Sequence, residues 1–215
     1  MKKSILALAL AASGTLAVTA ISAQEQPQVP GAPDVSRVQA GDYTLDASHT
    51  LVSWQVGHFG FNDYIGLFGQ IVGTMTLDPA DIDATQFDIT VPITSVSVPS
   101  EGLRDHLLRP GKDGGDPDFF GAEPEAARFV STSVDLGADG TSAEITGNLA
   151  LNGVTRPVKM DARFTGAGAH PRSQVETVGF EASGTILRSE FGIGYAIPMV
   201  SDEVELKISA AFEKQ

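Results

Sequence analysis

The sequence predicts an all-β protein, built as one antiparallel β-barrel of about eight strands with a short helix near residues 100–108. Two observations lead to this fold class. Large apolar side chains recur at every second position along most of the chain after Tyr43, and residues typical of tight turns separate the alternating segments. Alternation of period two indicates strands with one dry and one solvated face, as antiparallel sheets have. A parallel α/β sheet would instead show continuous apolar runs with long helices between them.

The first 23 residues have the order of a secretory signal peptide. Lys2 and Lys3 begin it, an uncharged apolar run covers 5–12, and small residues lead to Ala20 or Ala23, either of which suits cleavage. The alternative is a membrane anchor. The apolar run is interrupted at 13–15 and stays short of the roughly 20 residues that a span requires. We therefore expect export, with the signal peptide removed.

Residues 24–40 are predicted to be a flexible linker. They contain three prolines and few large apolar side chains, a composition typical of an extended tether. The alternative is an ordered strap lying across the barrel. Residues 41–215 then form a single barrel domain, a length that one β domain commonly reaches.

The charge of the chain excludes several classes of function. Without residues 1–23, which carry two lysines and no acid, 27 acidic residues stand against 12 basic ones, a net charge of −15. Such a surface repels nucleic-acid phosphates and anionic membrane surfaces. No later segment is long and apolar enough for stable membrane insertion, and the absence of cysteine means that the core alone must support the fold.

The alternating segments follow one another along the barrel domain. In 52–58 and 204–213 every second residue is apolar or aromatic, with small or polar residues between. In 67–77 we expect one strand with Leu67 and Ile71 on the same face. Further strands are expected at 87–93, 145–151, 158–164 and 180–186. Eight strands are about the number at which a closed barrel can hold one small ligand.

Turn and cap residues mark the ends of these elements. Asn152-Gly153 is a strong hairpin signal, and Asp78-Pro79 and Asp139-Gly140 predict two more turns. Ser100 is a candidate N-cap for the short helix, in which Leu103 and Leu107 share a face. Pro110 and the glycines that follow it predict a flexible loop after the helix.

The chain resembles the YceI-like family of periplasmic polyisoprenoid-binding proteins, which have a lipocalin-like fold. The resemblance runs from Tyr43 to about Phe212 and rests on the order and spacing of short motifs. These are Tyr43-Thr-Leu-Asp46 with His49, Val56-Gly-His58, Gly66-Leu-Phe68, Arg104-Asp105-His106-Leu107, Asp118-Phe119-Phe120, Phe129-Val-Ser-Thr132, Gly147-Asn148-Leu149, Gly153-Val-Thr-Arg-Pro-Val158, Arg188-Ser-Glu-Phe-Gly192 and Asp202-Glu-Val204.

The resemblance implies a periplasmic binding protein that sequesters or carries a polyisoprenoid or isoprenoid-quinone-like lipid, without catalysis, cofactor or metal. The predicted ligand-binding residues are Trp54, Val56, His58, Phe68, Ile89, Val91, Leu103, His106, Leu107, Phe129, Phe180, Arg188 and Phe191. The stretch 109–117 is longer than the family's usual link, which leaves the preference for a lipid head group open.

Alternatives remain at this stage. One is a hydrolase or isomerase-type enzyme acting on a lipid at the barrel mouth with His106, Asp105 or Arg188, although no activated nucleophile is evident. A second is a barrel with a solid core that acts only through partners. A zinc site made of His49, His58 and His106 is a further possibility, but the spacing of these residues matches no zinc-binding motif. His49 is expected to make a structural hydrogen bond.

The role of Arg188 and the oligomeric state are also open. Arg188 either pairs with an acid such as Glu190 or Asp202 or faces a ligand head group. The sequence is compatible with a homodimer and does not require one.

Overall fold

The structure, a computed structural model, describes residues 29–215. Within these residues, ten strands carry the fold, with one α-helix and five short 3-10 helices. The strands are β1 (Gly41–Leu45), β2 (Leu51–His58), β3 (Asn62–Phe68), β4 (Val72–Leu77), β5 (Gln86–Val91), β6 (Ala127–Leu136), β7 (Ser142–Leu151), β8 (Val154–Ala169), β9 (Glu176–Leu187) and β10 (Glu203–Lys214). The helices are α1 (Glu101–Leu108), η1 (Val35–Arg37), η2 (Ile82–Ala84), η3 (Ile93–Ser95), η4 (Lys112–Gly114) and η5 (Arg188–Phe191).

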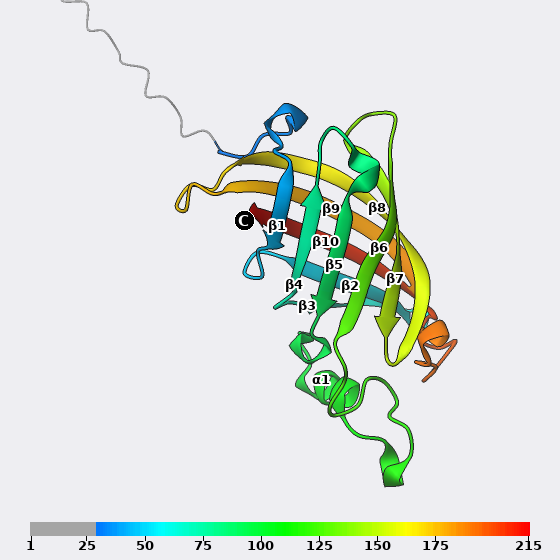
Figure 1. The fold of residues 1–215 in the computed structure, drawn as a ribbon. Helices are drawn as coiled ribbons and strands as arrows, with labels where there is room; N and C mark the ends of the chain where they lie inside the picture. Colours follow the sequence, from blue (N-terminus) through cyan, green and yellow to red (C-terminus); the bar gives the residue numbers. More distant parts are fainter. Residues whose placement is uncertain (1–28) are drawn as a thin grey trace, which may run out of the picture.

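The sheet closes into a barrel with eight strand positions, all neighbours antiparallel (Figure 1). One edge of β10 pairs with β9, and the other edge pairs with β2 near its start and with β1 near its end. β1 and β2 are therefore two halves of one interrupted strand. β3 and β4 are halves of the next, because β3 pairs with β2 and β4 with β1. The predicted barrel of about eight strands is confirmed.

The prediction of one continuous strand over 67–77 is wrong. The chain leaves the sheet between β3 and β4, where Gln70 adopts φ 53°. Leu67 is 38% exposed whereas Ile71 is 1% exposed, so the two do not share a face. The three residues between the strands shift the alternation by one position, and such a shift moves every later side chain to the opposite face.

The predicted turns and helix are confirmed. Asn152 and Gly153 have φ values of 51° and 74°, as a two-residue hairpin requires. The Ser100 side chain accepts a hydrogen bond from the Leu103 N–H at 3.2 Å and caps α1. The loop expected after the helix contains the short turn η4. Helix α1 lies at one end of the barrel, which we call the helix end (Figure 1).

The described part of the predicted linker, residues 29–40, contacts the barrel. Residues 1–23, expected to be the signal peptide, lie outside the described residues. Ala32 pairs with Ala167 of β8 through two backbone hydrogen bonds of 3.1 and 2.9 Å, and η1 lies at the opposite end of the barrel from α1. Residues 29–40 thus fit the alternative of an ordered strap. We call the end of the barrel at which η1 lies the strap end. No helix among residues 29–215 is long and apolar enough to cross a membrane.

Fully buried apolar side chains gather near the two ends of the barrel. The cluster at the strap end is centred on Tyr43, Met75 and Phe212, and the cluster at the helix end on Ile93 and Leu107. Along the middle of β2 and β5, inward side chains are only partly buried. This distribution leaves a space between the two clusters.

Candidate ligand-binding cavity

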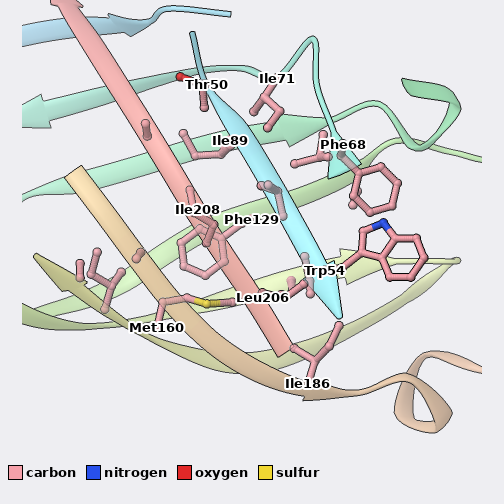
Figure 2. Close-up of a pocket in the computed structure, with 18 of the residues that line it drawn as sticks. Thr50, Trp54, Phe68, Ile71, Ile89, Phe129, Met160, Ile186, Leu206 and Ile208 are labelled. Carbon is pink, nitrogen blue, oxygen red and sulfur yellow. The ribbon is translucent and has the colours of Figure 1, made fainter. Parts of the chain in front are cut away.

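One large cavity of about 1330 Å³ runs through the barrel. Ile89, Phe129, Met160 and Ile208 come from four different strands and point into the same space (Figure 2). The cavity reaches from the strap, where Val35 and Val38 line it, to Leu103 and Leu107 of α1. Pockets for drug-sized ligands measure about 300–1,000 Å³, so this cavity suits a longer ligand.

The cavity stays open because two inward-facing glycines leave room for aromatic rings against the wall. A Cβ on Gly66 would lie 2.2 Å from Cζ2 of Trp54, its cross-strand partner. A Cβ on Gly147 would lie 2.4 Å from Cζ of Phe129. The rings therefore lie over backbone instead of projecting fully into the lumen. The solid-core alternative is wrong, because Trp54, Phe129 and Phe180 line the cavity and leave its centre unfilled.

Few polar groups interrupt this lining. The Thr50 hydroxyl accepts a hydrogen bond from the Ala211 N–H at 3.3 Å. The Trp54 indole nitrogen and the Thr85 hydroxyl are buried without a hydrogen-bond partner among the described residues. A lining of this kind favours burial of hydrocarbon over recognition of a polar molecule.

The structure brings twelve of the thirteen sequence-predicted residues to the cavity wall. They are Trp54, Val56, His58, Phe68, Ile89, Val91, Leu103, His106, Leu107, Phe129, Phe180 and Arg188. Phe191 does not line it. After β9 the chain enters η5, which ends the alternation, and the Phe191 side chain is fully buried beside the β7–β8 hairpin, where its carbonyl accepts a hydrogen bond from Asn152.

Sequence reasoning left out other lining residues. Met160, Leu206 and Ile208 lie on alternating strand faces and could have been found from the same pattern. Val35 of the strap and Met199 of the 193–201 loop carry no periodic signal, because neither belongs to a strand.

His106 belongs to a small network at the helix end. Its Nε2 lies 2.8 Å from Oδ2 of Asp118, and Arg109 donates to the same oxygen at 2.7 Å. The Arg109 guanidinium, followed by the His106 ring, holds the pKa of the Asp118 carboxyl below its usual range. The ring also packs edge-on against Phe119 and Tyr195, with centroid separations of 5.1 and 5.2 Å. His106 thus connects α1 to the loops around the cavity mouth.

Arg188 is a buried anchor for the loop 193–201. Its guanidinium donates four hydrogen bonds of 2.8–2.9 Å, all to backbone carbonyl oxygens. The acceptors belong to Ile193, Tyr195, Val200 and Ser201. Burial lowers the pKa of Arg188 from its ordinary value. With its donors directed to the loop, Arg188 is poorly placed to bind a ligand head group.

Among the described residues, neither acid considered as a partner of Arg188, Glu190 or Asp202, forms an ion pair with it. Asp202 accepts hydrogen bonds from the Ser189 backbone N–H at 2.8 Å and hydroxyl at 2.6 Å, which lower the pKa of its carboxyl. His49 makes the expected structural hydrogen bond, with Nδ1 2.6 Å from Oδ2 of Asp46. Among residues 29–215, no three potential metal-ligating side chains gather into one group.

Comparison with known proteins identifies relatives over most of this barrel. A family model described as the YceI-like domain matches residues 43–212. The protein YceI from Escherichia coli is 36% identical over 173 residues, which cover 79% of this chain and 85% of the relative.

Two solved structures share the fold. BcnA from Burkholderia cenocepacia is 23% identical with a TM-score of 0.62, and the match covers 78% of this chain and 98% of BcnA. A polyisoprenoid-binding domain from Saccharophagus degradans, implicated in plant cell wall breakdown, is 12% identical with a TM-score of 0.53. That match covers 82% of this chain and the whole of the domain.

Proposed function

This chain belongs to the YceI-like family, and from that premise we propose that its barrel binds a polyisoprenoid or a similar long-chain apolar lipid. The observation that carries the proposal is the continuous apolar cavity of about 1330 Å³ between the strap and α1. The domain from Saccharophagus degradans, which shares the fold, is described as polyisoprenoid-binding, and this supports the choice of lipid.

The size and lining of the cavity agree with such a ligand. An apolar cavity of about 150 Å³ holds benzene, so the volume here is roughly nine times as large. Each buried methylene contributes about 0.8 kcal/mol, and one five-carbon isoprene unit about 3–4 kcal/mol. Micromolar binding needs about 8 kcal/mol net. A few isoprene units therefore suffice, even after several kcal/mol are lost on immobilisation.

The proposed role is carriage or sequestration in the periplasm. Residues 1–23 supply the signal for export, and the acidic exterior keeps a lipid-loaded barrel dispersed in water. We propose no catalytic step. The network of His106, Asp118 and Arg109 serves to hold α1 against the loops at the mouth, because each of its polar contacts joins elements of the protein.

The first prediction concerns the cavity itself. Organic extraction of the gently purified protein, followed by mass spectrometry, is expected to release a long-chain isoprenoid lipid. Ala182 lines the middle of the cavity from β9. Ala182→Phe introduces a ring into this space and is expected to lower affinity for an added polyprenol at least about tenfold. The ring occupies space that the lipid chain would otherwise fill, so fewer of its methylene groups are buried.

Ser183 on the outer face of the same strand offers the matched control. Ser183→Phe adds the same ring outside the barrel and should leave affinity within about twofold. Absence of lipid in repeated extractions, together with no uptake of added polyprenol or isoprenoid quinone, would refute the proposal.

A further inference from the structure

Two neighbouring loops at the helix end expose four large apolar side chains. Phe59 and Phe61 lie in the turn between β2 and β3, and Tyr195 and Met199 in the loop 193–201. They are 49%, 89%, 45% and 55% exposed, respectively. We call these four residues the mouth platform. Exposed apolar side chains gathered in one place mark an interaction surface more often than chance.

The two loops are joined to each other by their backbones. The Phe59 N–H donates to the Met199 carbonyl at 2.7 Å, and the Ser201 N–H donates to the Gly57 carbonyl at 2.9 Å. Arg188 holds the second loop through its carbonyl oxygens. The platform is therefore fixed before any partner arrives, which lowers the entropic cost of binding.

The geometry of the turn between β2 and β3 does not require aromatic residues. Phe59 has φ 53°, a conformation that is uncommon for bulky side chains and costs less for glycine or asparagine. A phenylalanine at this position, and another that is almost fully exposed two residues later, indicate selection for contact with a partner and not for the stability of the turn.

The mouth platform is continuous with the cavity. Phe59, Tyr195 and Met199 line the cavity as well as the outer surface, whereas Phe61 does not line the cavity and lies only on the outside. Apolar surface thus extends from the interior of the barrel to its rim. A long-chain lipid crossing this rim from an apolar environment stays largely out of water, which removes the main barrier to its transfer.

The charge pattern identifies the kind of partner. Residues 57–62 and 191–201 contain no Asp, Glu, Lys or Arg, although the chain carries 27 acidic and 14 basic residues. Charged side chains are costly in the hydrocarbon of a bilayer, and aromatic side chains favour its interface. A stable protein partner needs about 20–30 residues on each side. The mouth platform is much smaller, which favours shallow insertion into lipid.

We propose that the mouth platform docks on the surface of a phospholipid bilayer and that the lipid ligand passes between bilayer and cavity at this end of the barrel. The route of the ligand rests on the proposed lipid-binding function, whereas the docking surface stands on its own observations. The net charge of −15 that remains without residues 1–23 predicts a preference for zwitterionic over anionic bilayers.

Phe61→Ser tests the platform without altering the cavity wall. In flotation with phosphatidylcholine vesicles, the affinity of the variant is expected to be about tenfold lower than that of the wild type, since the most exposed phenylalanine of the platform no longer inserts into the bilayer. The rate of transfer of a fluorescent isoprenoid from the vesicles should fall with it. Val72→Ser removes a half-exposed apolar side chain from β4, away from the platform, and should leave both quantities unchanged.

A second measurement reports position directly. The indole introduced by Phe61→Trp should be quenched by brominated phosphatidylcholine in vesicles, and the indole introduced by Val72→Trp should not. The background from the native Trp54, the single tryptophan of the chain, is measured in the wild type.

The outcomes separate the two proposals. Binding of farnesol added from water, followed by Trp54 fluorescence, reports the cavity alone, and Phe61→Ser should leave it unchanged. Failure of the wild type to bind farnesol or polyprenol, with vesicle binding retained, refutes the proposed function and leaves docking intact. Equal flotation of Phe61→Ser and wild type overturns the docking surface. A concentration-dependent dimer that Phe61→Ser abolishes also overturns it, in favour of a second copy of the chain.

Discussion

At the scale of single residues, Arg188 has the largest structural role relative to what the sequence suggested. The sequence left it between an ion pair and a ligand contact, and it is instead a cation that holds four carbonyl oxygens. The planar guanidinium presents several donors in a fixed geometry, which a lysine ammonium cannot reproduce. The sequence did not predict this anchoring role, because every residue has a backbone carbonyl and no sequence pattern marks the ones that Arg188 binds.

Arg188→Met is therefore expected to lower the free energy of unfolding by about 3 kcal/mol or more, since it leaves buried carbonyl oxygens without donors. Arg188→Lys should recover only part of this loss. Urea unfolding followed by Trp54 fluorescence measures both. Arg163→Met removes an exposed arginine paired with Glu181 on the outer wall and serves as the control, with little expected change. Equal stability of the two methionine variants would contradict the anchoring role.

At the scale of elements, the sequence predicts the parts that depend on local chemistry. Three features were predicted correctly: the alternation in β10, the cap of α1 and the Asn152-Gly153 turn. Each depends only on the residues of one short segment of the chain. The interruption between β3 and β4 was not predicted, because it depends on the pairing of β4 with β1, a strand that is distant in the sequence. The pairing of the strap with β8 was not predicted for the same reason, since its pairing partner Ala167 lies far along the chain.

The β6–β7 turn gives a prediction on acid stability. The Thr141 N–H, the Ser142 N–H and the Ser142 hydroxyl donate to Asp139, in that order of importance, and lower the pKa of its carboxyl from 3.8 to about 2. Because the pKa of Asp139 is lower in the folded state than in the unfolded state, its ionised carboxylate stabilises the folded protein at pH values above the unfolded-state pKa. This contribution is lost as the pH falls from about 4.5 to about 2.

Thermal unfolding across this range should accordingly show a smaller acid-induced fall in Tm for Asp139→Asn than for the wild type. Asp161→Asn, on the outer face of β8, provides the comparison and should behave as the wild type does. An unchanged acid profile in Asp139→Asn would show that the turn makes no such contribution.

At the scale of the whole molecule, the closed barrel was predictable and its hollow interior was not. Large apolar residues at alternate positions are required both for a filled core and for a cavity lining. The difference lies in pairs such as Trp54 with Gly66, in which one strand supplies a ring and the next supplies room beside it. Pairing of this kind depends on register between strands, which alternation within one strand does not define.

An apolar cavity of this size couples stability to occupancy. Delipidated protein should melt at a lower temperature than loaded protein, since a ligand that binds only the folded state at 100 times its Kd stabilises by about 2.7 kcal/mol. Calorimetry before and after extraction, and after reloading with polyprenol, measures the shift. The Ala182→Phe variant should show a smaller response, and identical melting of extracted and reloaded wild type would argue against an internal ligand.

The way in which Arg188 grips its loop has a consequence for how this barrel can change over generations. The guanidinium touches main-chain oxygens, which every amino acid supplies, so the anchor is indifferent to the identity of the exposed side chains above it. Substitutions at Met199 can therefore accumulate without loosening the hold of Arg188 on the loop. The exposed side chains of the mouth can therefore vary while the anchor stays the same, which allows new specificities to arise by natural variation or by library design.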